Sequence, residues 1–365
     1  MPSRLFSPLT LRGATFDNRI AVAPMCQYSA SHGTPGEWHL MHLGTYAISG
    51  AGLVIIEATG VEAEGRITAD CTGLYTDAQE QAFDRILSFC RSVGPAKFGI
   101  QLGHAGRKAS TVAPWLGGGP IEGKGAWIPD APSPVPYLDG WDIPHALDDA
   151  GLARVKSAFA DAARRAARLK LDYVEIHAAH GYLLHQFLSP LTNRRNDAYG
   201  GDLEGRMRFP LEVFDATRAA LPDATPIAVR LSATDWVDGG WDVEQSIAFS
   251  QALKARGCDA IHVTSGGLRQ DQAIETGPGY QIGFAAEIRR ATGLPVIAVG
   301  QITEATHAES IIRTGEADMV ALARALLWNP RWVWHAADTL GASVAPPAPY
   351  ARSHPSLSAK PFVKR

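Results

Sequence analysis

The 365-residue sequence lacks the features that mark several classes of protein. Its four cysteines lie far apart, and no two have the spacing of a zinc or redox motif, so a disulfide framework is not expected. The formal net charge is only −3, which gives no reason to expect a nucleic acid or an anionic membrane as a partner. No signal-type apolar run follows the start, and no stretch reaches membrane-spanning length. The absence of a disulfide pattern, a signal-type run and a membrane-spanning stretch predicts a cytoplasmic protein with reduced thiols.

A glycine-rich phosphate-binding turn after the first strand is also missing. A doubly wound open sheet would need one, and Pro24-Met-Cys-Gln27 is not such a turn. Instead, eight short apolar runs alternate with helical patterns, which is typical of an α/β protein with a (β/α)8 TIM barrel. The runs that predict strands are 20–25, 53–57, 97–102, 171–176, 226–231, 260–264, 295–300 and 318–323. The patterns that predict helices are 38–50, 76–90, 155–169, 204–221, 243–256, 284–292 and 303–314.

The barrel core usually needs about 250 residues, so the remainder of this chain must lie outside it. Residues 5–20 predict a short hairpin that caps the start. Residues 110–144, after the third strand, are rich in glycine, proline and tryptophan and have no sustained periodicity, which indicates a lid or binding loop. The chain 1–365 is therefore interpreted as a single barrel domain with a lid and, over about 345–365, a C-terminal arm.

The segment His177-Ala-Ala-His-Gly-Tyr182 follows the fourth predicted strand. Chemistry is placed at the carboxyl ends of strands in parallel α/β proteins, and Gly181 lets the backbone turn sharply there. His177 and His180 offer N–H donors. Tyr182 offers a hydroxyl whose unperturbed pKa of about 10 keeps it protonated at neutral pH. This set suits a substrate oxygen that becomes negative while a proton is supplied nearby.

Further polar residues are expected at the same ends of the other strands. The loops after the seventh and eighth strands are where this fold commonly holds phosphate. Gly300 would allow close backbone approach there, and the guanidinium of Arg324 could pair with a phosphate. The other strand-end residues of this kind are Cys26, Tyr28, Gln101, His104 and Arg230.

Several motifs together carry a family resemblance. They are Pro24-Met-Cys-Gln-Tyr28, Gln101-Leu-Gly-His-Ala-Gly-Arg-Lys108, His177-Ala-Ala-His-Gly-Tyr182, and Asn193-Arg-Arg-Asn-Asp-Ala-Tyr-Gly-Gly201 with Arg206. The combination resembles the Old Yellow Enzyme family of FMN-dependent ene-reductases. A cysteine after Pro-Met and a tyrosine two residues later resemble its thermophilic-like bacterial branch, which includes xenobiotic reductases.

The resemblance implies FMN bound across the top of the barrel, with NADPH or NADH as the reductant. Gln101 and Arg230 would hydrogen-bond the pyrimidine edge of the flavin, and Arg230 would stabilise negative charge on the reduced ring. The family often has alanine at the position of Gly60 and glycine at that of Ala323. The implied cofactor-binding residues are Pro24, Met25, Cys26, Gly60, Gln101, Arg230, Gly300, Gln301, Ala323 and Arg324.

The resemblance also implies ping-pong reduction of the C=C bond of α,β-unsaturated carbonyl or nitro compounds. His177 and His180 would hold the substrate oxygen, hydride would pass from reduced FMN to the β-carbon, and Tyr182 would protonate the α-carbon. Tyr28 would contact the substrate. Cys26 would lie near the reactive nitrogen of the flavin and tune its electron affinity without acting as a nucleophile.

The proline-rich segment that ends in Pro349-Tyr-Ala-Arg352 predicts an extended arm with few local hydrogen bonds. Such an arm would gain little by folding on its own barrel. It resembles the carboxy-terminal arm of the same branch, in which an arginine reaches the partner's pocket. The resemblance therefore implies that Arg352 contributes to a neighbouring substrate site in a homodimer or a higher homo-oligomer.

Other interpretations stay open at this point. Two histidines three residues apart could bind a metal, but no carboxylate or third histidine lies at a fitting spacing, so none is expected. A dienoyl-thioester reductase would carry a cysteine cluster after the barrel, and no cysteine follows Cys258. An aldolase or isomerase on the same fold, or a non-catalytic binding barrel, is also compatible with the fold class. His104 and Lys108 could be structural or could help to seat the nicotinamide or the flavin phosphate.

Overall fold

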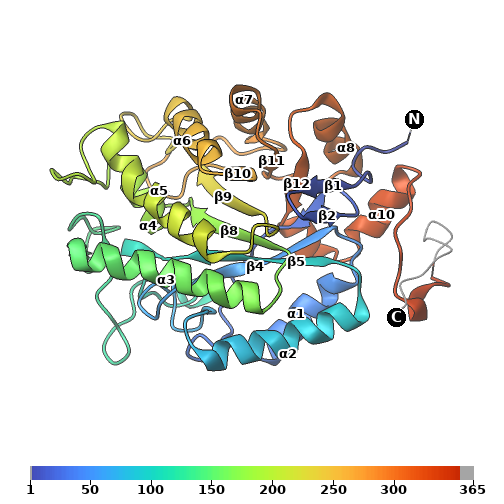
Figure 1. Ribbon diagram of the computed structural model, residues 1–365, viewed down its shortest axis with the longest axis horizontal. Coiled ribbons are helices and arrows are strands. Elements are labelled where there is room, and N and C mark those ends of the chain that lie inside the picture. The colour runs from blue at the N-terminus through green and yellow to red at the C-terminus, as the bar shows by residue number, and fades with distance from the viewer. Residues whose placement is uncertain (1, 354–365) are drawn as a thin grey trace.

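Eight parallel strands close into a barrel in the computed structural model, which describes residues 2–353 (Figure 1). The last strand pairs with the first through Val320 and Ile20, so the predicted (β/α)8 barrel is confirmed and the open doubly wound sheet is excluded. In order around the barrel the strands are β3 (Ile20–Val22), β4 (Leu53–Gly60), β5 (Lys97–Gly103), β8 (Tyr173–Ala178), β9 (Ile227–Ser232), β10 (Ala260–Thr264), β11 (Val296–Ala298) and β12 (Met319–Leu322).

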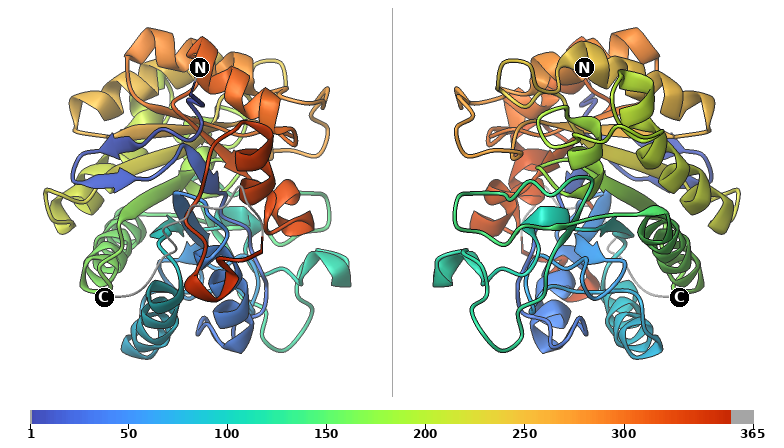
Figure 2. Two further views of the ribbon diagram at one scale, coloured as in Figure 1. Left: turned by 90° about the vertical axis from the view of Figure 1, so that its right-hand side faces the viewer. Right: turned by 90° about the vertical axis from the view of Figure 1, so that its left-hand side faces the viewer.

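Helices surround the barrel and bury one apolar face each against it (Figures 1 and 2). In α3, the apolar stripe of Val155, Phe159 and Ala162 is fully buried. Helix α2 starts with a capping box, in which the amide of Gln79 donates to Thr76 Oγ1 over 3.3 Å. The long outer helices are α1 (Glu37–Ala47), α2 (Asp77–Val93), α3 (Asp149–Arg168), α5 (Leu203–Ala220), α6 (Val243–Ala255), α7 (Ile282–Thr292), α8 (Ala305–Thr314) and α10 (Trp332–Thr339).

Two strand boundaries differ from the prediction in ways that affect the top of the barrel. The first strand ends at Val22 and not at residue 25, since Pro24 has no N–H to donate to a neighbouring strand. The fourth strand does not stop before His177 but continues through Ala178, because His177 and Ala178 pair with Arg230 and Leu231 of β9. His177 is therefore held by the sheet itself and is not a loop residue.

The predicted hairpin closes the amino-terminal end of the barrel. Strands β1 (Leu9–Leu11) and β2 (Ala14–Phe16) pair antiparallel, and the Phe16 ring meets the ring of Tyr173 edge-on at 6.5 Å. Tyr173 is the first residue of β8 and points into the barrel, so this contact seals the end opposite to the predicted site. No helix in residues 2–353 is both long and apolar enough to cross a membrane.

The predicted lid, 110–144, is confirmed as an insertion after β5, but it contains some regular structure. Strand β6 (Asp130–Ala131) pairs with β7 (His145–Ala146) just beyond its end, which ties the two sides of the loop together. The indole of Trp127 donates to the carbonyl of Glu64 over 2.9 Å. Pairing of two-residue strands depends on distant segments and leaves no periodic pattern to read in the sequence.

The predicted arm is only partly extended. Residues Ala348–Tyr350 form a 3-10 turn in which the amide of Tyr350 donates to the carbonyl of Pro347 over 2.8 Å. The Tyr350 ring lies 6.3 Å from Trp334 of α10, and the guanidinium of Arg331 lies 5.5 Å from the Tyr350 ring centre. The expectation that the arm gains little on its own barrel was therefore wrong for this stretch, because an aromatic side chain anchors it. Residues 354–365 of the predicted arm lie outside the described part of the chain.

Candidate active site

Residues that the sequence places far apart meet at the carboxyl ends of the strands. His177 of β8 pairs in register with Arg230 of β9, and Gln101 of β5 pairs with Glu175 of β8. The ring of His177 packs edge-on against the rings of His180 and Tyr182. The distances between ring centroids are 5.2 Å and 4.9 Å. The predicted cluster of donors therefore exists as one group around the barrel mouth.

The backbone between His180 and Tyr182 makes the predicted sharp turn. His180 and Gly181 have φ angles of +57° and +74°, and a Cβ at Gly181 would lie 2.4 Å from the carbonyl oxygen of Gly267. The ammonium of Lys108 donates to the carbonyls of His180 at 2.8 Å and Gly267 at 3.0 Å. Between the two open interpretations of Lys108, the structure supports the structural one, because the ammonium ties two loops together.

A buried His–Asp contact supports this turn from below. His185 of α4 (Leu183–Leu188) accepts the amide of Gly181 at Nδ1 over 2.9 Å, so its proton is on Nε2, 2.9 Å from Asp235 Oδ1. Asp235 also accepts the hydroxyl of Ser189 at 2.6 Å and the amide of Trp241 at 2.7 Å. The sequence did not indicate this pair, since nothing in the spacing of His185 and Asp235 links them.

The histidine rings are oriented by their other nitrogens. His177 Nδ1 accepts the amide of Ala179 at 3.2 Å, which leaves Nε2 as the protonated nitrogen. His180 Nε2 lies 3.0 Å from Thr264 Oγ1, so Nδ1 is the nitrogen left for a ligand. Burial and then the charge of Arg230 lower the pKa of both rings well below the usual value. Both rings are neutral at pH 7. His177 offers an N–H at Nε2, and His180 offers one at Nδ1 in the tautomer whose Nε2 accepts the Thr264 hydroxyl.

Tyr182 combines a free hydroxyl with a strongly held proton. Within residues 2–353 its hydroxyl has no described hydrogen bond, and the side chain is half-buried. Burial, with smaller contributions from Cys26 and Tyr28, raises the pKa of Tyr182 well above 10. The ammonium of Lys108 lies 4.9 Å from the centre of the ring. The hydroxyl is therefore a neutral proton donor beside the two imidazoles.

Cys26 lies beside a second cysteine that the sequence did not connect with it. Its thiol shares a hydrogen bond with the thiol of Cys71, which is buried and lies 3.3 Å from Thr68 Oγ1. This hydrogen bond and burial raise the pKa of Cys26 well above its usual value. The Cys26 side chain is therefore a thiol at neutral pH. No linear spacing suggested the pair, because the loop that carries Cys71 folds back over the end of β4.

A bulge in β4 fixes the backbone next to Cys26. The register with β5 shifts between Ile56 and Ala58, where Glu57 is the extra residue. The buried carboxylate of Glu57 accepts the amide of Gln27 at 2.9 Å and lies 3.2 Å from His39 Nε2. Pro24, Met25, Cys26 and Tyr28 are consequently held half-buried along the barrel mouth, as the predicted cofactor and substrate contacts require.

Arg230 and Gln101, which are predicted to hold the flavin ring, offer a hydrogen-bond donor and an acceptor that suit its pyrimidine edge. Arg230 is 8% exposed, and its Nε has no hydrogen-bond partner within the described residues. The Nε–H is therefore a buried donor that a ligand can satisfy. The amide nitrogen of Gln101 donates to Glu175 over 2.7 Å. This bond turns the amide nitrogen of Gln101 toward Glu175, so its oxygen is directed away from the carboxylate and can accept an N–H of the pyrimidine ring.

The loops predicted to bind the flavin phosphate have a glycine with positive φ and an arginine with no described partner. Gly300 has a φ of +136°, and Gln301, with a φ of +50°, continues the turn after β11. Ala323 precedes Arg324, which is exposed and has no described hydrogen bond or ion pair in residues 2–353. Gly60 is less available than predicted, because Thr72 and Leu74 already take its backbone N–H and C=O.

The remaining predicted contacts divide between the lid and the arm. Tyr28 has a φ of +48°, and its ring meets the exposed Trp115 of the lid edge-on at 5.7 Å. Arg352 is exposed on the arm, and the described contacts of the chain do not bring it to the barrel mouth. Apart from Arg352, the predicted residues lie at or next to the carboxyl ends of the barrel strands.

One group of side chains has the composition of a metal site. Glu62, His104 and Asp130 bring potential ligand atoms within 4.8 Å of one another, and His104 Nε2 lies 3.0 Å from Glu62 Oε1. The guanidinium of Arg154 bridges the two carboxylates, which satisfies their charge without an ion. His104 is therefore part of an ion-pair network under the lid, which matches its structural interpretation.

Comparison with known proteins identifies the family. The model of the NADH:flavin oxidoreductase / NADH oxidase family matches residues 4–342. The chain belongs to this family. This flavin oxidoreductase is 43% identical over 362 residues to the NADH:flavin oxidoreductase FG08077 of Gibberella zeae, covering 94% of this chain and 87% of the relative. It is 41% identical over 354 residues to the NADPH dehydrogenase of Geobacillus thermodenitrificans, covering 96% and 99%.

Solved structures agree with this assignment. Morphinone reductase superposes with a TM-score of 0.76 at 29% identity, covering 94% of this chain and 91% of that chain. An Old Yellow Enzyme homologue from Zymomonas mobilis superposes with a TM-score of 0.73 at 28% identity, covering 90% of each. The predicted membership of the Old Yellow Enzyme family is confirmed. The protein is an FMN-dependent oxidoreductase that uses a reduced nicotinamide.

Proposed function

We propose that this flavin oxidoreductase is an ene-reductase for α,β-unsaturated carbonyl and nitro compounds. When bound, FMN supplies a two-electron carrier that takes hydride from NADPH or NADH and passes it to the β-carbon of the substrate. The observation that carries the proposal is the group of three neutral donors at the barrel mouth, His177, His180 and Tyr182. A conjugated carbonyl or nitro group needs two functions from the protein, stabilisation of its oxygen and a proton.

His177 and His180 supply the first function. Each ring is fixed through one nitrogen and directs the other toward the site. Because the low pKa values keep both rings neutral, they stabilise a developing negative charge by hydrogen bonding and do not protonate the oxygen outright. A single donor in other oxyanion sites contributes about 3–4 kcal/mol to the transition state.

Tyr182 supplies the second function. Its hydroxyl has no described partner in residues 2–353, and it lies on the ring that His177 contacts edge-on at 4.9 Å. A phenol releases a proton far more readily to a carbanion than to water, so a raised pKa does not prevent the transfer to the α-carbon. The nearby ammonium of Lys108 stabilises the phenolate that remains.

The experiment that tests the function uses the purified native protein. We expect one FMN per chain, bleached by anaerobic NADPH and restored by 2-cyclohexenone, a maleimide or a nitroalkene. Cyclohexanone, which has no C=C bond, is the control and should leave the flavin reduced. Reduction of the flavin by NADPH without reoxidation by any of the three alkenes would contradict the ene-reductase proposal while leaving the family assignment intact.

Replacing Tyr182 with phenylalanine removes the proton donor and almost no volume. We expect reduction of the flavin by NADPH to be nearly unchanged, whereas reoxidation by the enone should slow roughly a hundredfold or more, which is the usual contribution of a general acid. Stopped-flow measurement of the two half-reactions separates these effects. Equal loss in both would show that Tyr182 is structural.

We also propose that Cys26 adjusts the electron affinity of the flavin and forms no bond to the substrate. The thiol is protonated and hydrogen-bonded to Cys71, and this form is a poor nucleophile. Cys26→Ala should therefore shift the reduction potential of the flavin and change the rates while keeping substantial turnover. The matched control is Cys71→Ser, which leaves Cys26 in place. An obligatory Cys26–substrate adduct, trapped during turnover and detected by mass spectrometry, would refute this role.

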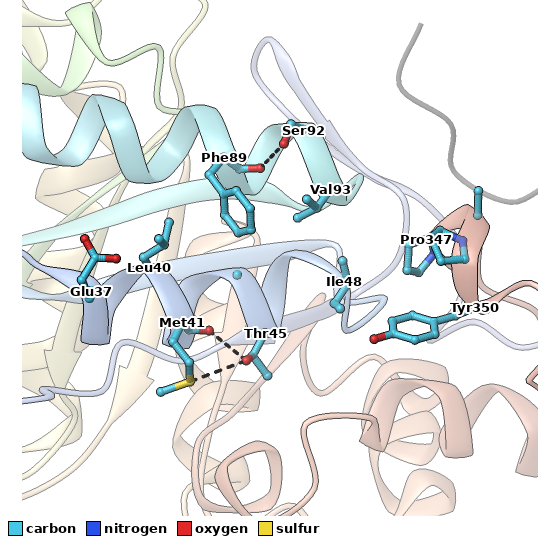
Figure 3. A pocket seen from close by; sticks show the side chains of 13 residues that line it. Glu37, Leu40, Met41, Thr45, Ile48, Phe89, Ser92, Val93, Pro347 and Tyr350 are labelled. Atoms are coloured by element: carbon cyan, nitrogen blue, oxygen red, sulfur yellow. Dashed lines mark hydrogen bonds between the residues drawn. The ribbon is translucent and has the colours of Figure 1, made fainter.

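The basic unit is proposed to be a homodimer in which Arg352 reaches the neighbouring substrate site. An open apolar groove of about 790 Å³ runs between α1, α2 and the arm (Figure 3). Met41 and Phe89 are 50% and 45% exposed in it, which is unusual for large apolar side chains on a free surface. A second copy is the proposed occupant, since the arm that carries Arg352 forms one wall. The apolar lining is Leu40, Met41, Ile48, Phe89, Val93 and Tyr350.

Truncation tests the shared site directly. Ending the chain after Pro349 removes the aromatic anchor and Arg352, so we expect weaker self-association and a higher KM for the enone. Ending it after Ser353 keeps both and is the matched control. Light scattering and steady-state kinetics on the same samples give the two measurements. A monomeric wild type, or an unchanged KM after the shorter truncation, would rule the shared site out.

A further inference from the structure

A fully buried carboxylate lies inside the barrel beneath the proposed flavin edge. Glu175 is 0% exposed and points inward from β8, two residues before His177. Its Oε1 accepts the amide of Gln101 at 2.7 Å, and its Oε2 accepts the hydroxyl of Tyr173 at 2.9 Å. Nδ1 of His262, from β10, lies 2.9 Å from the same Oε2. Three strands therefore direct polar groups at one carboxylate, in a region that is otherwise apolar.

The carboxylate is charged despite its burial. Burial alone would raise the pKa of Glu175, but the hydrogen bond with His262, the charge of Arg230 and the hydrogen bond from the Tyr173 hydroxyl outweigh it and lower the pKa below the usual value. The His262 ring is neutral at pH 7, because burial lowers its pKa. Arg230 is thus the positive charge that balances Glu175. No contact within 4.0 Å joins the two, so the guanidinium is not neutralised by a direct ion pair and keeps its buried donor free.

The same carboxylate also determines which atom Gln101 presents upward. Because the amide nitrogen of Gln101 donates to Glu175, its oxygen is directed away from the carboxylate and toward the ligand. Glu175 therefore acts on both residues assigned to the pyrimidine edge, on Gln101 through a hydrogen bond and on Arg230 through charge. Neither effect requires Glu175 to touch the cofactor.

We propose that Glu175 is a positioning residue that sets the reduction potential of the flavin by offsetting the charge of Arg230 and orienting Gln101. The proposal rests on the FMN site and not on the identity of the substrate. With Glu175 present, the field of Arg230 at the ring edge is reduced. Without it, Arg230 would be an uncompensated buried cation, which favours the anionic reduced flavin and disfavours the folded apoprotein.

Loss of the Glu175 charge should raise the reduction potential of the flavin and lower the stability of the apoprotein, and this combination makes the test specific. In Glu175→Gln holoenzyme we expect reduced FMN to gain about tenfold in affinity relative to oxidised FMN, an upward shift of about 30 mV for a two-electron couple. The apoprotein should unfold at a lower urea concentration than the wild type. Potentials are measured by anaerobic dye equilibration, and stability by urea titration of the apoprotein.

Tyr173→Phe is the matched control. It removes a hydrogen bond from the same carboxylate but leaves the charge, so stability should fall while the potential stays at the wild-type value. A potential that is unchanged or lower in Glu175→Gln, or an equal upward shift in Tyr173→Phe, would overturn the proposal. Loss of enone reduction alone would count against the proposed substrate class and not against Glu175.

A double variant keeps the proposal testable if Glu175→Gln does not fold. Glu175→Gln combined with Arg230→Gln removes both charges, so it should be more resistant to urea than the single Glu175→Gln variant, or should fold where the single variant does not. No recovery in the double variant would show that Arg230 is not the charge that Glu175 balances, and the proposal would fail.

Discussion

The separation of opposite charges inside the barrel is the constraint on which the upper half of the structure depends. Glu175 and Arg230 are both buried, and each offsets the cost that burial imposes on the other. They are held apart by the strand register, since Arg230 pairs with His177 and not with Glu175. A closed barrel fixes that register on both sides of every strand, so the guanidinium is kept charged, buried and available to a ligand.

The proposed catalytic side chains are held in place by hydrogen bonds from the residues around them. His177 belongs to a strand, and His180 is held through its backbone by Lys108 and through its ring by Thr264. Below them His185 and Asp235 support the turn at Gly181 without reaching the barrel mouth. These contacts leave Nε2 of His177 and Nδ1 of His180 for a ligand. The hydroxyl of Tyr182 has no described hydrogen-bond partner within residues 2–353.

Sequence reasoning was most successful where chemistry coincides with a local pattern. The eight apolar runs gave the barrel, and the strand-end residues from Cys26 to Arg324 proved to share one face. It erred where long-range contacts override the local pattern. Strand β8 extends to Ala178 because β9 offers partners, and the arm folds at Tyr350 because Trp334 is there to receive the ring. Neither partner is visible from the neighbouring residues in the chain.

The sequence by itself determined the fold class, the family and the residue types at the barrel mouth. Hydrophobic periodicity and short motifs are local properties, and the chain carries them wherever it folds. Only the tertiary structure decided which polar atoms remain free, because that depends on partners from distant strands. It joined Cys71 to Cys26 and Asp235 to His185, and it turned Gln101 by means of Glu175. Hydrogen-bond satisfaction and burial are properties of the whole packed barrel, so no single segment could reveal them.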